Sequence, residues 1–348
     1  MVDWLDRVGD PGRIHQEGLE ARHAVEVARE QVAALLGARP RSVVFTSGAT
    51  EAIAAACFGA SERGGHSVLA AVEHSAVRRH AERAGAATVV GVDGAGRIDA
   101  GELIAAIRRD TGLVHIQWGN HEVATLQPVA EVVAACRERG VLVHVDAAMA
   151  AGRVPIDFDG LGIDLLSVSG HKLGGPAGTG ALLVRRGLRI DPLLLGGDQE
   201  RARRAGMENV AGVVGLGAAA AAIDVHAEAL AQRRLCERML EESLLVEGIS
   251  LLGDPDPAGR LPHLLCLAVA GIEPQAVLLG LDRAGIAAHS GSACATEGLE
   301  PSPVLEAMGV DAHRSLRLSV GWSSTPADVE ALRDALPRVV GDLRRLGG

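Results

Sequence analysis

Apolar residues recur along the first two thirds of the chain in short runs that alternate with helical stretches. Apolar positions at helical spacing predict an amphipathic helix over 17–36. Runs rich in Val, Leu, Ile and Ala then predict seven buried strands, at residues 42–46, 67–72, 87–92, 113–118, 141–145, 164–168 and 180–184. Such an alternation indicates a mainly parallel sheet covered on both faces, the α/β class. We expect the ligand at the carboxyl ends of the strands.

The pattern changes after a long Ala-rich helical region that covers about 210–245. The turn-rich segment 253–257 interrupts it. The remaining elements are an apolar run, a helix, a Gly/Ser loop, a strand and a helical tail, at 264–270, 274–284, 290–295, 315–320 and 326–346. We therefore predict a large domain at 14–245 and a smaller one formed by 246–348 together with 1–13.

Composition and charge exclude several classes of protein. Hydrophobic residues make up 48% and charged residues 22% of the 348 positions, which excludes global disorder. The formal net charge of −10 argues against nucleic acid as a direct partner. The longest uncharged apolar stretch, 210–223, is shorter than the roughly 20 residues of a membrane-spanning helix. The start of the chain lacks the pattern of a secretory signal, so we expect a cytoplasmic protein without a membrane partner.

The cysteines and histidines give no sign of a disulfide framework or a metal site. The 5 Cys residues are an odd number and include no CxxC pair. His144 and Asp146 are two apart on a predicted strand and share a face. A third and fourth ligand at close spacing are missing, so we expect no metal.

The most specific chemical feature is the segment 169–172, which ends in Lys172 and closes an apolar strand. A lysine amine forms a Schiff base with a carbonyl, and enzymes that use pyridoxal phosphate (PLP) pair this with a carboxylate for the pyridine nitrogen. Asp146, at the carboxyl end of a Val-rich strand, is the candidate carboxylate. Taken singly, the two residues could equally be a surface-loop Lys and a capping Asp. Together they favour the cofactor.

A phosphate group would bind where backbone N–H groups converge at a helix N-terminus. Residues 46–51 lie between the first strand and an Ala-rich helix, and they contain Gly48 and Thr50. Glycine permits close approach, and the Thr50 hydroxyl can donate a hydrogen bond. A simple capping box would have the same appearance, so this signal is weak by itself.

These motifs resemble the PLP-dependent class V aminotransferase family, and within it the cysteine desulfurases. The similar stretches extend from about Gly9 to Thr325. Six motifs occur in order, at residues 44–51, 73–77, 120–123, 144–147, 169–172 and 290–294. The resemblance implies a fold-type I PLP-dependent transferase, in which a large domain with a mainly parallel seven-stranded sheet precedes a smaller C-terminal α+β domain. It also implies a homodimer.

The resemblance assigns a role to each matching residue. Lys172 would bind PLP covalently, Asp146 would pair with the pyridine nitrogen, and His74 would stack on the ring and assist proton transfer. The phosphate would be bound by Ala49, Thr50, Ser169 and His171. Arg317 would bind the substrate carboxylate.

Cys294 is the expected sulfur carrier, because it lies in a Ser/Gly/Ala loop like that of the longer-loop group of cysteine desulfurases. The implied reaction converts L-cysteine to L-alanine and leaves a persulfide on Cys294 for an acceptor protein or a thiol. The other cysteines, at positions 57, 136, 236 and 266, are expected to be buried and inert. Two alternatives stay open: another class V reaction, such as transamination or elimination, and a catalytically weak scaffold relative.

Several positions depart from the family pattern. His121 stands where the family has Asn and Met149 where it has Gln, and both positions are expected to face the phenolic oxygen of the cofactor. Met207 replaces a Thr that in relatives reaches the phosphate of the neighbouring subunit. The family's usual leading strand and Ala-Thr-Thr loop are also absent from the start of the chain. The sequence does not identify the sulfur acceptor, the pathway, or whether selenocysteine is used.

Overall fold

The computed structural model describes residues 1–290 and 301–347. The chain divides into two compact units, and each is described by itself. The first unit comprises residues 1–90, 100–118 and 128–224, and the second unit comprises 91–99, 119–127 and 225–348.

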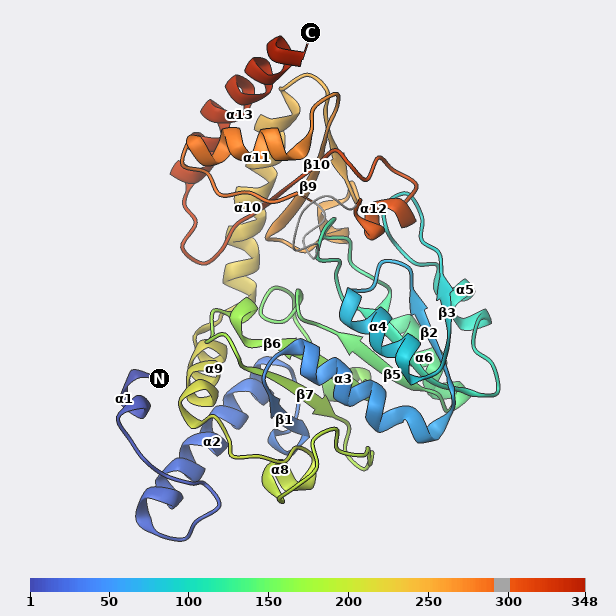
Figure 1. Cartoon of the computed structure of the whole chain (residues 1–348), viewed down its shortest axis with the longest axis vertical. Coiled ribbons are helices and arrows are strands. Elements are labelled where there is room, and N and C mark those ends of the chain that lie inside the picture. Colours follow the sequence, from blue (N-terminus) through green and yellow to red (C-terminus); the bar gives the residue numbers. More distant parts are fainter. Residues whose placement is uncertain (291–300, 348) are drawn as a thin grey trace. The chain divides into compact units, whose positions relative to one another are not determined.

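The first unit is built on a seven-stranded sheet with the order β1-β7-β6-β5-β4-β2-β3 (Figure 1). Its strands are β1 (Val43–Thr46), β2 (His66–Ala70), β3 (Ala86–Val90), β4 (Thr111–Gln117), β5 (Leu142–Asp146), β6 (Leu165–Ser169) and β7 (Gly180–Val184). Only β7 is antiparallel to its neighbours, and the other pairs run parallel. The predicted mainly parallel sheet, and each of its seven predicted strands, is confirmed.

Helix α3 (Ala49–Ala60) crosses the sheet and contacts β5, β6 and β7 (Figure 1). It can lie close because Ala52, Ala56 and Ala60 face the strands and are buried with Val44 and Leu165 in one apolar cluster. The helices of this unit are α1 (Val2–Leu5), α2 (Gln16–Leu35), α3 (Ala49–Ala60), α4 (Ser75–Ala84), α5 (Ala100–Ala105), α6 (Val129–Arg139), α7 (Phe158–Leu161), α8 (Gln199–Ala202) and α9 (Val210–Ala222), with 3-10 turns at Pro40–Ser42, Ser61–Arg63 and Gly170–Leu173.

The second unit is built on an antiparallel three-stranded sheet with the order β10-β9-β8. Its elements are α10 (Val225–Leu244), β8 (Ile249–Leu252), a 3-10 turn at Pro257–Gly259, β9 (Leu264–Val269), α11 (Pro274–Arg283), α12 (Pro303–Ala307), β10 (Ser315–Ser319) and α13 (Pro326–Gly347). Leu265, Leu267 and Leu316 form the middle of its core, where Val277 of α11 and Leu332 of α13 pack against them. The sequence reasoning did not predict β8, which is short and pairs with only one neighbour.

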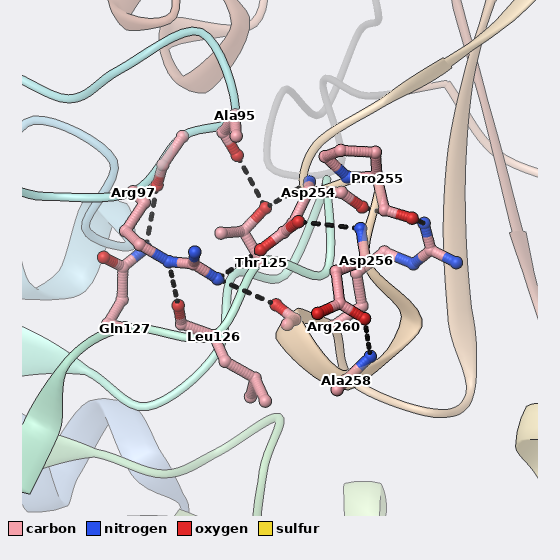
Figure 2. A network of polar contacts seen from close by, with 12 residues as sticks. Ala95, Arg97, Thr125, Leu126, Gln127, Asp254, Pro255, Asp256, Ala258 and Arg260 are labelled. Atoms are coloured by element: carbon pink, nitrogen blue, oxygen red, sulfur yellow. Dashed lines mark hydrogen bonds and ion pairs between the residues drawn. The ribbon is translucent and has the colours of Figure 1, made fainter.

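Two short segments of the first two thirds of the chain, 91–99 and 119–127, belong to the second unit. Arg97 connects them, because its Nε donates to the carbonyl of Leu126 at 3.1 Å and its guanidinium forms an ion pair with the buried carboxylate of Asp254 (Figure 2). This ion pair joins a loop and a turn that are more than 150 positions apart in the chain.

Thr125 supports the same network from the other segment (Figure 2). Its hydroxyl donates to the carbonyl of Ala95 at 2.6 Å and accepts the N–H of Asp254 at 3.1 Å. Asp254 Oδ1 then accepts the N–H of Asp256 at 2.8 Å, which shapes the turn-rich break predicted from the sequence. A Cβ on Gly253 would lie 2.4 Å from the carbonyl oxygen of Val123, and φ there is +95°, so both geometry and space require glycine.

No single helix in the described part of the chain is long and apolar enough to cross a membrane; α9 and α10 meet that test of length and composition only when they are counted as one bent pair.

A buried ion pair attaches α8 to the rest of the first unit. Arg29 of α2 donates through Nη1 and Nη2 to the two carboxylate oxygens of Glu200, at 2.7 and 2.8 Å. Glu200 also accepts the N–H of Phe45 at 3.0 Å, and Arg29 donates to the carbonyl of Val43 at 2.9 Å. Because the side chains of Arg29 and Glu200 are only 3% and 2% exposed, removal of the Arg29 charge leaves the Glu200 carboxylate buried without its ion-pair partner, whereas Arg29 also pairs with Glu26 at 3.0 Å.

We predict that Arg29→Met lowers the free energy of unfolding by about 3–5 kcal/mol, because it leaves the Glu200 carboxylate buried and unpaired. The measurement is urea unfolding of the protein without added cofactor. The double variant Arg29→Met/Glu200→Gln removes the unpaired charge and keeps an acceptor for Phe45, so it should recover part of the loss.

The control for this prediction is Arg238→Met, which breaks an exposed ion pair with Glu330. An exposed pair contributes about 0–1 kcal/mol, so this variant should unfold almost like the unmodified chain. Equal effects of Arg29→Met and Arg238→Met would contradict the role given to burial.

Candidate functional site

The predicted site residues of the first unit gather at one edge of its sheet, where the parallel strands end. Asp146 is the last residue of β5, and Ser169 is the last residue of β6. Gly180 begins the antiparallel β7 and pairs with both Ser169 and Thr46, the last residue of β1. The sheet therefore places the carboxylate, the Ser169 hydroxyl and the loop after β1 along the same carboxyl edge.

Asp146 is 8% exposed, and its recorded hydrogen bonds fall on one carboxylate oxygen. Oδ1 accepts the N–H of Ala148 at 2.9 Å and the hydroxyl of Ser167 at 3.3 Å. Neighbouring strands hold its backbone, because Trp118 N–H donates to the Asp146 carbonyl at 2.8 Å. The arrangement fixes the carboxylate and keeps Oδ2 available to a further donor.

The loop between β1 and α3 forms an open helix N-terminus. Among the described residues, no side chain caps the first turn of α3, whose N-cap is Gly48. A Cβ placed on Gly48 would meet no heavy atom within 4 Å. At Gly180, a Cβ would lie 2.6 Å from Gly48 Cα, so the absence of this atom lets the loop lie against β7. The N–H groups of Ala49 and Thr50 thus face a space that suits an anion.

A salt bridge holds this helix N-terminus in place. Glu51 Oε2 accepts the N–H of Ser47 at 2.8 Å, and Glu51 Oε1 accepts from Arg204 Nε at 2.9 Å. Arg204 lies in the segment that follows α8, which the Arg29–Glu200 ion pair attaches to the unit. The capping function considered for this motif is therefore carried by Glu51, which bonds Ser47, and the N–H groups of Ala49 and Thr50 are left to another acceptor.

Lys172 lies in the 3-10 turn Gly170–Leu173, immediately after β6. A Cβ on Gly170 would lie 2.2 Å from Thr179 Oγ1, so glycine is needed where the turn leaves the strand. In the same turn, His171 Nδ1 lies 3.0 Å from the hydroxyl of Ser169. Desolvation and then the charge of Lys172 lower the pKa of His171, which favours its neutral form near pH 7.

His74 is the N-cap of α4, and its Nδ1 accepts the N–H of Ala76 at 3.1 Å. In a neutral ring this leaves the proton on Nε2. The preceding Glu73 is 1% exposed, and its carboxylate accepts the N–H of Gln117 at 2.7 Å. Since Gln117 of β4 is the register partner of Asp146 on β5, the loop that carries His74 is anchored one strand away from the carboxylate.

In the second unit, Arg317 and His121 are brought together. Arg317 lies on β10 opposite Cys266 of β9, and its Nη1 donates to the carbonyl of His121 at 3.0 Å. The His121 ring is nearly buried, with Nε2 3.5 Å from Glu122 Oε1. Glu122 also accepts a short hydrogen bond from the hydroxyl of Ser302. The guanidinium of Arg317 is thus held by the backbone of the segment that carries His121.

The remaining residues singled out from the sequence, two methionines and the cysteines, differ in their exposure to solvent. Met149 lies half-buried in the turn after β5, and Met207 is 62% exposed. Cys294 lies outside the described residues. All the described cysteines are buried, and burial raises the pKa of each thiol to about 12.

Of three buried polar residues next to Asp146, His144 was considered from the sequence only as a possible metal ligand, and Ser167 and His115 were missed. Ser167 bonds the carboxylate directly, and His144 Nε2 lies 3.2 Å from the Ser167 hydroxyl. His115 Nδ1 lies 3.1 Å from His144 Nδ1. All three are completely buried. The signal that could have found them is a polar side chain at alternate positions of an apolar strand, because alternate residues share the face of Asp146.

Comparison with known proteins decides the family. The family model for the class V aminotransferases matches residues 6–332. The chain belongs to that family. It is 42% identical to a cysteine desulfurase from Trichormus azollae over 98% of this chain and 88% of the relative. The predicted membership of the cysteine desulfurases within the class V aminotransferases is confirmed.

Two solved structures are similar over most of their length. A NifS-like protein is 30% identical with a TM-score of 0.90, and the match covers 98% of this chain and 94% of that protein. The structure of SspA in complex with cysteine is 30% identical with a TM-score of 0.79, and that match covers 91% and 92% of the two chains.

Class V aminotransferases are PLP enzymes, and the residues of the first unit fit this cofactor. The open N-terminus of α3 suits its phosphate. Asp146 Oδ2, to which none of the described residues donates, suits a protonated ring nitrogen, because a buried carboxylate is most stable beside a cationic donor. Lys172 is the only lysine of the chain and lies in the turn that follows β6, the strand next to β5. These residues thus offer a partner to the phosphate, the ring nitrogen and the aldehyde of the cofactor.

The buried histidines predict a specific loss of stability in acid. Burial lowers the pKa of His115 to about 3 and that of His144 well below its usual range. The unfolded chain, with pKa values near 6.5, binds more protons than the folded chain between these limits. The contribution of the two neutral rings to the free energy of unfolding is therefore fully present above about pH 6.5. It decreases as the pH falls toward 3, by about 1.4 kcal/mol per pH unit for each histidine.

The measurement is the free energy of unfolding in urea at pH 7 and pH 5, without cofactor. His115→Asn removes one of the two titrating groups. The free energy of unfolding of this variant should therefore decrease from pH 7 to pH 5 by about 2 kcal/mol less than that of the unmodified chain. Carboxylates titrate equally in both proteins and cancel. An unchanged pH dependence in His115→Asn would refute the assignment of a neutral, buried ring.

Proposed function

We propose that the chain is a cysteine desulfurase that converts L-cysteine to L-alanine and transfers the sulfur to Cys294. The observation that supports this most directly is the set of residues at the carboxyl edge of the first sheet, where the chain's only lysine follows the strand next to Asp146. The likeness to cysteine desulfurases over 98% of the chain gives the reaction type.

Each polar group at this edge has a defined task. PLP, when bound, serves as an electron sink for the amino acid attached to it. Asp146 would accept the N–H of the pyridine ring and so favour its protonated form. The N–H groups at the start of α3, with the hydroxyls of Thr50 and Ser169 and the ring of His171, bind the phosphate.

Lys172 has two tasks that occur at different times. Its amine would hold the cofactor covalently in the resting enzyme. When that amine is free, it would take the proton from the substrate Cα. His74 would stack on the cofactor ring and assist proton transfer, and Met149 and His121 would face the phenolic oxygen. Arg317 binds the substrate carboxylate.

Sulfur transfer balances without an external oxidant. The Cys294 thiol and L-cysteine give L-alanine and a persulfide on Cys294: the substrate C–S bond breaks and one S–S bond forms. A protein or small thiol then accepts the outer sulfur atom. The proposal includes a homodimer, as in the family that the sequence resembles, and a cytoplasmic location.

We predict that Lys172→Ala loses the covalent attachment of PLP. No other side-chain amine exists in the chain, so borohydride treatment of the loaded variant should leave no cofactor on the protein after denaturation. Absorbance and mass spectrometry measure this directly. Cofactor that stays attached to the variant would overturn the assignment of Lys172.

Cys294→Ser separates cofactor binding from sulfur transfer. We expect the variant to bind PLP and cysteine as before, because the thiol acts on the substrate sulfur only. Alanine formation and protein-bound persulfide should both fall at least tenfold, by analogy with the loss of other nucleophiles. Alanine is quantified by chromatography and the persulfide by thiol-specific labelling.

The control is Cys136→Ala, which removes a buried thiol of α6 and should leave both products unchanged. Normal turnover in Cys294→Ser would show that another residue accepts the sulfur. Formation of pyruvate or of a keto acid in place of alanine by the unmodified chain would favour elimination or transamination. A chain that binds PLP but forms none of these products would favour the scaffold alternative.

A further inference from the structure

A chain of buried polar side chains leads from helix α3 to the Asp146 carboxylate. Cys57 Sγ lies 3.7 Å from His115 Nε2, and His115 Nδ1 lies 3.1 Å from His144 Nδ1. His144 Nε2 lies 3.2 Å from the hydroxyl of Ser167, which lies 3.3 Å from Asp146 Oδ1. Only Asp146, at 8%, and Cys57, at 5%, have measurable exposure. The reaction proposed above gives no role to Cys57, His115 or His144.

Strand register places these side chains on one face of the sheet. His115 of β4 is the register partner of His144 of β5, and Ser167 of β6 is the partner of Asp146 of β5. His144 and Asp146 are two positions apart on the same strand and therefore share a face. Cys57 comes from α3, which covers this part of the sheet. The contact of all five residues thus follows from the fold and not from a chance side-chain conformation.

The carboxylate end fixes the direction of the hydrogen bonds. An ionised Asp146 only accepts, so the Ser167 hydroxyl donates its single proton to Oδ1. The Ser167 oxygen must then accept from His144, which places the His144 proton on Nε2. In a neutral ring, His144 Nδ1 consequently carries a lone pair and accepts from its own partner.

The proton positions of His115 and Cys57 follow from that of His144. His115 Nδ1 must carry a proton in order to donate to His144 Nδ1, so a neutral His115 has its lone pair on Nε2. Cys57 remains a thiol, because burial raises its pKa to about 12, and its S–H is the donor to His115 Nε2. Both rings are neutral, since burial lowers the pKa of each. Every proton in the chain then points toward Asp146.

We propose that Cys57, His115, His144 and Ser167 form a directed hydrogen-bond chain, with the two rings in opposite tautomers, whose function is to hold Asp146 as an ionised and oriented acceptor for the cofactor nitrogen. His115 and His144 are positioning residues: they act through Ser167 and do not touch the reacting atoms. The inference about the cofactor rests on the proposed function, whereas the direction of the chain is a property of the protein alone.

Two physical effects connect the chain to the carboxylate. Successive hydrogen bonds in a region of low dielectric constant polarise one another, so each donor strengthens the next toward the negative charge. The Ser167 hydroxyl and the Ala148 N–H also occupy Oδ1. This occupancy leaves Oδ2 as the oxygen that meets the ring nitrogen, and it prevents rotation of the carboxylate.

The first test measures the tautomers in the protein without cofactor. Nitrogen-15 labelling of the histidines and long-range proton–nitrogen spectra distinguish Nδ1–H from Nε2–H rings. We expect His115 protonated at Nδ1 and His144 at Nε2 from pH 6 to 8, with assignments taken from His115→Asn and Ser167→Ala. A His144 ring protonated at Nδ1, or either ring doubly protonated at pH 7, would overturn the directed chain, whatever the protein does with PLP.

The second test measures PLP binding by the same chain. His115→Leu removes the donor to His144, and the loss of one buried hydrogen bond in the chain should weaken the affinity for PLP by about fivefold to tenfold. His115→Asn keeps an amide N–H near the position of Nδ1 and should restore most of that affinity. Cys136→Ala, which removes a buried thiol that makes none of these contacts, is the matched control and should not change it.

The outcomes separate the two proposals. Unchanged affinity in His115→Leu, or equal losses in His115→Leu and His115→Asn, would refute the positioning role even if both tautomers are as expected. If the unmodified protein binds no PLP, the proposed function fails, and the tautomer measurement still decides whether the directed chain exists. Should His115→Leu not fold, comparison of Cys57→Ser, which keeps a donor, with Cys57→Ala, which removes it, replaces it in the affinity test.

Discussion

The site in the first unit depends on the close packing of helix α3 against the sheet. Small side chains on the inner face of the helix, such as Ala52 and Ala56, let its backbone lie near β5, β6 and β7. Helix α3 therefore contributes to the site through both its first and its third turn. Its first turn presents free N–H groups at the carboxyl edge of the strands, and its third turn places Cys57 against the buried face of β4. A larger residue at either alanine would move both contacts together.

The rest of the first unit holds this helix in register with the strands. Gly180 lets the loop before α3 lie against β7, and Arg204 binds Glu51 in the first turn. Arg204 is itself placed by the neighbouring α8 segment, which the Arg29–Glu200 ion pair attaches to α2 and β1. Residues distant from these N–H groups therefore determine where the start of α3 lies, through a series of hydrogen bonds and ion pairs.

Local patterns predicted most of the architecture. The apolar runs identified all seven strands of the first sheet, and Lys172 and Asp146 could be identified because strand ends and motif residues are local features. Local patterns could not reveal which side chains meet across strands. The contact of His115 with His144 depends on strand register, and the ion pair of Arg97 with Asp254 depends on tertiary folding. For the same reason, segments 91–99 and 119–127 could not be assigned to the second unit from the sequence.

The burial of polar groups behind Asp146 also explains why that face of the sheet can tolerate two histidines. A charged imidazole without a counter-charge would be strongly unfavourable there, whereas a neutral one that both donates and accepts loses little on leaving water. Neutrality and full hydrogen bonding together require one arrangement of protons, since each ring has a single N–H. The net negative charge of the group then lies on Asp146 alone, at the end that faces the site. The buried face thereby supplies orientation to the carboxylate without adding a competing charge.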